Sequence, residues 1–364
     1  MRQPTGSLAR LSCMRTRTRT TLLAATTLAL AASVAAGAQA LPSDARPQAA
    51  PRTVFDVSDL ETGAPPAVAW SERRSGRTVI HGTRGTTTPV PNQLTELAPM
   101  GSGYVIQTAG NRPTVTRWVA ADGTPGRREW RTGYGLGVSP SGATVAFSGR
   151  RGRVWTIDQQ AGRVLSFRSV PVAGKGRAVA VSRGDCKESA TSNGCTVYVN
   201  GARAWYTTSH GLVDRVPHLR LTSTGRGRWL GGITSISDTG SCSAMLSGWT
   251  VRWRTCDNQF SDISPDNRRV LGTPAYADGF GPTTLDVLAT ADGSVVRTFR
   301  SPTHGAVTTY FDEVWEDPEH VLVVTYSQEK WAIVRLGVDG SMEYAVAPRP
   351  GTTDLRTPFQ LQTR

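Results

Sequence analysis

A unit of four short strands recurs along the chain, and this repeat restricts the possible folds more than any other feature. In the clearest copy, residues 136–167, runs rich in Val, Trp, Ile and Leu are separated by tight turns at residues 139–142, 149–152 and 158–162. β-branched and aromatic residues favour strands, whereas Gly, Pro, Asp and Ser favour the turns between them. Each such unit therefore predicts a small antiparallel sheet.

The same order of strands and turns returns elsewhere in the sequence. Residues 310–346 repeat it, and residues 262–299 carry a Ser-Pro-Asp-Asn turn that corresponds to Ser-Pro-Ser-Gly at residues 139–142. Looser copies fit residues 67–93, 94–131, 175–218 and 219–258. The sequence thus contains about seven units of about 43 residues, the period expected for the blades of a propeller.

A four-stranded sheet cannot bury both of its faces alone, so the units must pack against one another, and a ring leaves no exposed end. We therefore expect an all-β fold, a single β-propeller of about seven four-stranded blades over residues 67–362. The closing strand is expected from residues 355–361 or from the lead-in near residues 54–57. A two-sheet sandwich or a β-helix is the alternative, but a sandwich does not explain a four-strand unit that recurs in register.

The Ser-Pro turns and Asp-Gly hairpins resemble the repeats of TolB-like and WD-type propeller proteins over most of residues 67–350. The resemblance implies the fold and leaves the function open, because propellers serve in binding, catalysis and assembly. The chain lacks the Gly-His and Trp-Asp pairs of true WD repeats. It also lacks room for the α/β domain that precedes the propeller of TolB, so the Tol-system role is not carried over.

The N-terminal segment predicts export. Alternating Arg and Thr over residues 15–20 are followed by an uncharged Ala/Leu/Val-rich run over residues 21–38 and by small residues up to Ala40. This is the pattern of a secretory signal peptide over residues 1–40, cleaved after Ala40. A Pro-rich lead-in over residues 41–66 would follow. The alternatives are an uncleaved anchor, because the run approaches the length of a membrane span, and a start at Met14 instead of Met1.

The cysteines agree with a secreted, extracellular protein. Outside the signal segment four of them remain, an even number in a compartment that permits disulfides. Short spacings around turn residues favour the pairs Cys186–Cys195 and Cys242–Cys256, each closing one hairpin and stabilising it by about 3 kcal/mol. A metal site would need Cys-x-x-Cys or converging histidines. Neither is present, so we expect no metal and no cofactor.

The sequence offers no catalytic residue. A Gly-x-Ser-x-Gly nucleophile motif is absent. The acidic cluster between residues 312 and 319 is interpreted as a solvated turn, because paired-carboxylate hydrolysis needs groups that face each other from different blades. Tryptophans at strand positions are predicted to pack between blades rather than to stack on sugar rings. The acidic residues are Asp312, Glu313, Glu316, Asp317 and Glu319, and the tryptophans are Trp155, Trp253, Trp315 and Trp331.

The charge of the chain is moderately basic. The formal net charge is +13. Five of these charges are arginines of the predicted signal segment, so the rest of the chain carries +8. Only three lysines occur, and the arginines are scattered singly among strands. Such an excess favours weak attraction to anionic wall polymers or lipid. No nucleic-acid partner is expected.

Candidate ligand-binding residues lie in the loops. In a propeller, the connection between the second and third strands and the connection between blades share one face, where the channel opens. The longest such loop, residues 274–281, carries aromatic side chains and an acid that no strand pattern requires. The candidates are Tyr276, Asp278, Phe280, Tyr134, Lys175, Arg177 and His304.

These observations predict a monomeric extracellular binding or scaffold module for a protein or a polysaccharide. One alternative is a glycan hydrolase or lyase that draws its channel residues from several blades. The other is electrostatic attachment to an anionic cell wall or membrane.

Overall fold

The computed structural model describes residues 50–363 except 92, 110–113, 159–163, 173–175, 183–185, 187–193, 278–279 and 354–356. The described residues belong to one compact unit, Ala49–Arg364. The predicted signal peptide, its cleavage after Ala40 and the candidates Lys175 and Asp278 lie outside the described residues. Within the described part no helix is long and apolar enough to cross a membrane.

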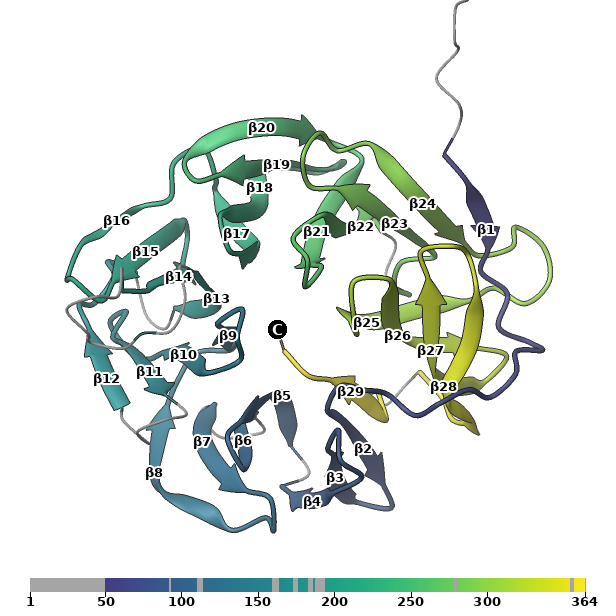
Figure 1. Cartoon of the computed structure of the whole chain (residues 1–364), viewed down its shortest axis with the longest axis horizontal. Helices are drawn as coiled ribbons and strands as arrows, with labels where there is room; N and C mark the ends of the chain where they lie inside the picture. Colours follow the sequence, from purple (N-terminus) through teal and green to yellow (C-terminus); the bar gives the residue numbers. More distant parts are fainter. Residues whose placement is uncertain are drawn as a thin grey trace, which may run out of the picture. The chain divides into compact units, whose positions relative to one another are not determined.

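Seven sheets surround one axis, and the described residues form a seven-bladed β-propeller built of strands alone (Figure 1). We number the blades along the chain and give their strands from the axis outwards. Blade 1 consists of β29 (Phe359–Leu361), β2 (Trp70–Arg74), β3 (Arg77–His81) and β4 (Thr87–Val90). Blade 2 consists of β5 (Leu94–Met100), β6 (Gly103–Thr108), β7 (Val115–Ala120) and β8 (Pro125–Arg131). Blade 3 consists of β9 (Gly137–Val138), β10 (Thr144–Ser148), β11 (Val154–Asp158) and β12 (Val164–Phe167).

The remaining four blades complete the ring. Blade 4 consists of β13 (Arg177–Ser182), β14 (Thr196–Asn200), β15 (Ala204–Thr208) and β16 (Val213–Arg215). Blade 5 consists of β17 (Leu221–Arg226), β18 (Trp229–Ser237), β19 (Gly240–Ser247) and β20 (Thr250–Thr255). Blade 6 consists of β21 (Asn258–Ile263), β22 (Arg269–Pro274), β23 (Thr284–Ala289), β24 (Val295–Arg300) and β1 (Arg52–Val54). Blade 7 consists of β25 (Thr309–Trp315), β26 (His320–Ser327), β27 (Lys330–Gly337) and β28 (Met342–Pro350).

The last strand of the chain closes the ring. β29 pairs antiparallel with β2, with Leu361 opposite Trp70, so the innermost strand of blade 1 comes from the other end of the sequence. Of the two closing segments expected from the sequence, the C-terminal one is therefore confirmed. The lead-in pairs elsewhere, because β1 adds a parallel fifth strand to the outer edge of blade 6 beside β24. Beyond it, Phe55 and Val57 enter the core between blades 6 and 7.

Apolar side chains fill the spaces between blades, as the sequence predicts. Trp315 and Trp331 are buried completely or nearly so, and Phe147 stacks on Trp155. Trp253 meets Phe260 edge to face at 5.0 Å between ring centroids. Flat aromatic rings suit these spaces because they contact two sheets at once, and truncation of such a ring typically costs about 3–5 kcal/mol.

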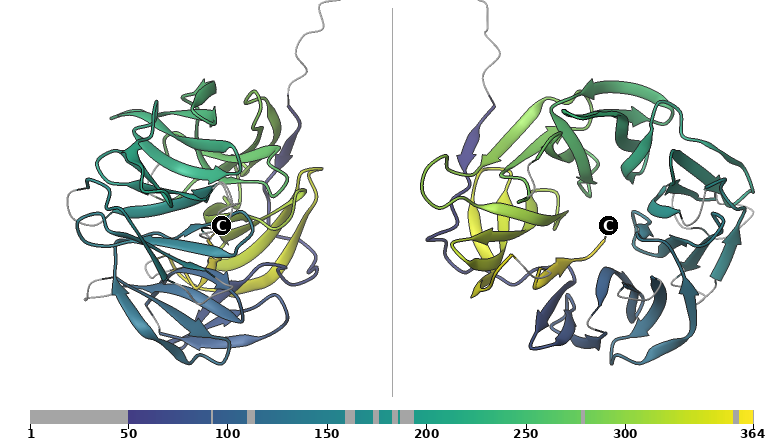
Figure 2. Two further views of the ribbon diagram at one scale, coloured as in Figure 1. Left: turned by 60° about the vertical axis from the view of Figure 1, so that its left-hand side comes forward. Right: turned by 180° about the vertical axis from the view of Figure 1, so that it is seen from behind.

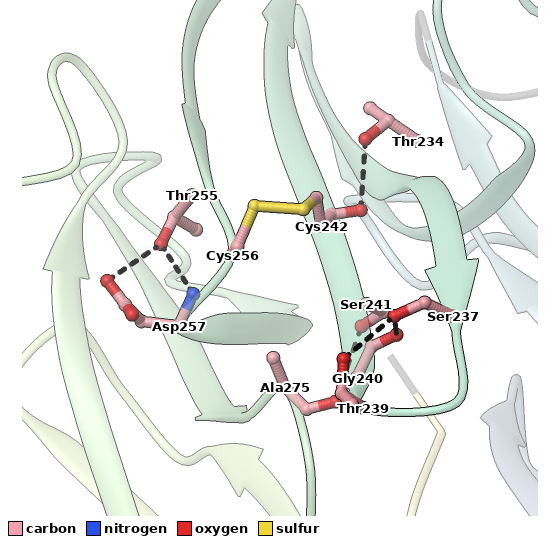
Figure 3. Close-up of a disulfide and its surroundings, with 10 residues drawn as sticks. All are labelled: Thr234, Ser237, Thr239, Gly240, Ser241, Cys242, Thr255, Cys256, Asp257 and Ala275. Atoms are coloured by element: carbon pink, nitrogen blue, oxygen red, sulfur yellow. Dashed lines mark hydrogen bonds between the residues drawn. A yellow bond between two sulfur atoms is a disulfide. The ribbon is translucent and has the colours of Figure 1, made fainter.

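Both predicted disulfides are confirmed. Cys186, in the connection after β13, pairs with Cys195, which directly precedes β14, and both residues are buried in the core between blades 3 and 4. Cys242 of β19 pairs with Cys256, the residue that follows β20, and so closes the outer hairpin of blade 5 (Figure 3). Two disulfides are compatible with an extracellular location.

Candidate functional site

Successive strands of a blade run in opposite directions, so the connections fall on two faces of the ring (Figure 2). Connections between blades and turns between second and third strands share one face, which we call the mouth face. Turns between first and second strands lie on the opposite face. The inner strands therefore begin at the mouth face.

A cavity of about 550 Å³ opens around the axis at the mouth face; we call it the mouth cavity. Its walls come from the inner strands of blades 2, 4, 5, 6 and 7 and from the closing strand β29. Both basic and acidic side chains line this cavity. The charged residues that line it are Arg73, Glu96, Arg177, Asp262, Asp312 and Glu313.

Five of the inner strands carry a bulge where they line this cavity. The register with the second strand shifts at Thr95 in blade 2, at Val179 in blade 4 and at Ser223 in blade 5. It shifts again across residues 261–262 in blade 6 and at Phe311 in blade 7. All of these residues line the mouth cavity. A bulge leaves a residue out of the ladder and re-aims its side chain, and bulges often occur beside binding or active sites.

Two adjacent carboxyl groups of β25 line the mouth cavity. Asp312 and Glu313 follow the bulge at Phe311 and pair in regular register with residues 324 and 323 of β26. Both border the cavity because β25 is the innermost strand of blade 7. The interpretation of this acidic cluster as a solvated turn is therefore wrong for these two residues. It is also wrong for Glu316, which is buried and pairs with Arg335. It holds for the exposed Glu319 and the partly exposed Asp317 of the following turn.

Burial shifts the protonation of the carboxyl groups in the cavity. Desolvation, with the nearby charges of Glu313 and Glu96, raises the pKa of Asp312 to about 8 although the Leu361 N–H opposes the shift. Desolvation also raises the pKa of Glu313, opposed by the Ser261 hydroxyl. It likewise raises the pKa of Glu96, opposed by the Thr363 hydroxyl and by Arg177. Asp312 is thus protonated at neutral pH and can donate a hydrogen bond.

The same carboxyl groups hold the closing strand and its continuation. Leu361 donates its backbone N–H to Asp312 at 2.8 Å, and the Thr363 hydroxyl donates to Glu96 at 2.6 Å. Gln362 and Thr363 line both the mouth cavity and a second cavity of about 360 Å³ on the opposite face. These two residues therefore form the floor of the mouth cavity.

The structure places the described candidate residues at the mouth face but does not gather all of them. Arg177 lines the mouth cavity, and Tyr134 precedes Gly135, which also lines it. A side chain at Gly135 would collide with Arg177, because its Cβ would lie 2.6 Å from the Arg177 Cγ. Tyr276, Phe280 and His304 are exposed in connections of blades 6 and 7 and do not line the cavity.

An aromatic rim extends from the cavity toward these exposed loops. Phe311 lines the cavity and is 39% exposed, and Phe280 is 74% exposed. A Cβ at Gly281 would lie 3.6 Å from the Phe311 ring, so the loop that carries Phe280 adjoins the beginning of β25. Sequence patterns point to Phe280, but they do not identify Phe311, because its exposure depends on the bulge.

The loop that carries Tyr276 has a firm base. Ala275 donates its N–H to the carbonyl of Asp257 at 2.8 Å, and Ser241 and Gln259 donate side-chain hydrogen bonds to the Ala275 carbonyl. Asp257 follows Cys256 directly, so the disulfide lies beside this base (Figure 3). Tyr276, which is 61% exposed, therefore projects from a cross-linked support.

Metal chemistry has no support in the described part of the chain. No three His, Cys, Asp or Glu residues there are arranged to hold a metal ion.

Comparisons with known proteins bear on the fold alone. No family model and no curated protein matches the sequence. Solved structures include 932 matching chains. One of them is the β-propeller domain of Cps50 (Swd1) from Myceliophteria thermophila, which is 11% identical, with a TM-score of 0.46. The match covers 71% of this chain and 86% of that one. A functionally unknown protein from Desulfotomaculum acetoxidans DSM 771 has 9% identity, a TM-score of 0.50 and coverage of 81% and 99%. The second likeness supports the propeller fold and nothing beyond it, and no argument rests on the first.

Proposed function

We propose that this protein is a secreted propeller that binds an extracellular protein or polysaccharide at its mouth face. The observation that carries the proposal is the set of bulges in five inner strands, whose extra residues all line one cavity of about 550 Å³. A cavity of this size is in the range of ligand sites. The signal-like segment and the two disulfides support secretion.

The chemistry of the cavity suits a partner that presents hydroxyl, amine or amide groups. Arg73 and Arg177 supply donors, and Glu96 and Glu313 supply acceptors. The protonated Asp312 adds a donor in the interior. The rim formed by Phe311 and Phe280, together with the exposed Tyr276 of the same connection as Phe280, adds apolar area at little cost in side-chain entropy, a frequent arrangement at binding surfaces.

A capture experiment tests this proposal. Oxidised mature protein is immobilised and exposed to secreted proteins and to a glycan array, alongside the double variant Arg177→Ala/Phe280→Ala. The matched control is Arg268→Ala/Leu212→Ala, which removes an exposed arginine and an exposed apolar side chain from turns on the opposite face.

We expect the wild type and the control to retain a ligand that the mouth variant loses. Loss in the control alone, or equal retention by all three proteins, would place binding outside the mouth. Retention that disappears in every protein when salt is raised would favour electrostatic attachment to an anionic wall or membrane instead.

Glycan hydrolysis is a second candidate, favoured by one observation. Carboxyl groups from blades 2, 6 and 7 line the same cavity, and the raised pKa of Asp312 is that of a general acid. Against it, Asp312 and Glu96 already accept hydrogen bonds from the C-terminal residues Leu361 and Thr363. The test is release of reducing sugar from soluble polysaccharides. Activity that Asp312→Asn abolishes would support catalysis, and no release by the wild type would reject it.

A further inference from the structure

A third cavity, of about 610 Å³, lies between blades 2 and 3 and shares no residue with the mouth cavity. We call it the interblade pocket. It is bordered by the β5–β6 turn and by the beginnings of β8 and β12, which places it on the opposite face. Its apolar walls are Met100, Trp118, Trp130, Ile157 and Val164.

The two tryptophans of this pocket differ from the most deeply buried tryptophans between blades. Trp315 and Trp331 fill their spaces and are buried. Trp118 and Trp130 are only partly buried and leave a space beside their rings. A solvent-open space of this size beside two indole rings is in the size range of ligand sites.

Both indole rings are held in place by their surroundings. The Trp118 ring lies over a glycine of each adjacent strand, Gly103 and Gly126. A Cβ atom added to Gly103 would lie 3.0 Å from the ring, and one added to Gly126 would lie 3.4 Å from it. The Trp118 indole N–H also points to the carbonyl of Met100 at 3.4 Å. Trp130 contacts Phe147 of blade 3 at 5.1 Å between ring centroids. Such fixed rings lose little entropy when a flat ligand is placed against them.

Two arginines border the same pocket, and one acidic residue, the buried Asp158, lines it as well. Arg127 and Arg128 both line it and are exposed. Arg128 lies two residues before Trp130 on β8, beside the place where the register between β7 and β8 shifts. Neither arginine forms an ion pair with a described residue, whereas Arg117 on the adjacent strand pairs with Glu129 at 2.7 Å. These guanidinium groups are thus available to an anion from outside.

We propose that the interblade pocket binds a uronic acid unit of an acidic polysaccharide. The C–H face of a pyranose ring packs against an indole ring, and a carboxylate pairs with a guanidinium group, often through two hydrogen bonds. The formal charge of +8 outside the signal segment favours the same anionic ligand at longer range. This site is independent of the mouth cavity.

A titration of the oxidised mature protein tests the proposal. The probe is a galacturonic acid hexamer, the comparison probe is a neutral galactose hexamer, and affinity is measured by calorimetry at 50 and 300 mM salt. We expect binding of the acidic hexamer alone, and weaker binding at 300 mM salt. Equal affinity for both hexamers, or no binding of the acidic one, would overturn the proposal.

Variants locate the bound sugar. Trp118→Ala and Arg128→Gln should each weaken binding at least tenfold, and Arg128→Gln should also reduce the dependence on salt. The control Trp249→Ala removes a partly buried tryptophan that packs on Tyr206 between other blades, and it should leave affinity unchanged. Arg128 is exposed, so its variant is expected to fold even where Trp118→Ala does not.

The mouth variant separates the two proposals. If Arg177→Ala/Phe280→Ala abolishes binding of the acidic hexamer while Arg128→Gln does not, the sugar binds at the mouth and the interblade site is refuted. If Arg128→Gln abolishes it and the mouth variant does not, the interblade site stands whatever the mouth binds.

Discussion

Replacement of Asp312 by Asn should reduce the loss of stability that the protein suffers as pH rises. In the folded protein the pKa of Asp312 is about 8, against an ordinary value of 3.8. Between about pH 4 and pH 8 the folded state therefore holds a proton that the unfolded state has released. The free energy of unfolding falls as pH rises through this range, because stability rises with pH only where the unfolded state binds more protons.

The size of the effect follows from the shift. The separation of the two pKa values corresponds to an upper limit of roughly 6 kcal/mol, at about 1.36 kcal/mol per pKa unit. Asp312 lines a cavity open to water, and relaxation around the ionised carboxylate reduces the cost. We expect about 2 kcal/mol. Asn cannot ionise, and its amide oxygen still accepts the Leu361 N–H, so Asp312→Asn should be more stable than the wild type by about this amount at pH 9.

Urea unfolding at pH 5, 7 and 9 measures the effect. The control is Asp292→Asn, in the exposed β23–β24 turn, where hydrogen bonds from Ser294 lower the pKa of the carboxyl group. For Asp292 the pH dependence of the free energy of unfolding has the opposite sign. The ionised Asp292 stabilises the fold at neutral pH, and this contribution is lost as pH falls through the lowered pKa of the folded state. Equal pH dependence in the wild type and Asp312→Asn would refute the reasoning.

Two further predictions concern the ring itself. Replacing Cys242 and Cys256 by Ser should lower the free energy of unfolding by about 3 kcal/mol through lost loop closure, and unchanged urea midpoints under oxidising conditions would contradict this. Replacing Phe359 by Ala should cost about 3–5 kcal/mol, because this buried ring of the closing strand contacts Trp70 at 5.8 Å. Thermal unfolding measures it, and the exposed Val295→Ala, which should change stability little, is its control.

Blade number and blade limits could be predicted because they depend on local chemistry. The turn at residues 139–142 and the Asp-Gly hairpins interrupt strand runs at a regular period, and each turn signal acts over a few residues. The sequence does not decide which of two segments closes the ring, because strand pairing is non-local. Both segments contain strand-forming residues, and only the fold decides that residues 359–361 join blade 1 while residues 52–54 join blade 6.

The lining of the mouth cavity could be predicted only in part. That Arg177 lines the cavity could be predicted, because the residue lies at the start of an inner strand. The sequence does not predict that Phe311, Asp312 and Glu313 line the cavity. A bulge shifts the alternation of side chains by one residue, and it has no fixed sequence signature in these strands. The interblade pocket was missed for a related reason: Trp118 has the same strand-like surroundings in sequence as the buried tryptophans, and the space beside it depends on the packing of two blades.

Hydrogen exchange of the oxidised protein with and without its captured ligand tests the central claim most directly. The account predicts protection of the first residues of the inner strands, 94–96, 177–179 and 309–313, and of the loop that carries Tyr276. Protection confined to the turns of the opposite face, with these segments unchanged, would contradict the assignment of the mouth face as the binding surface.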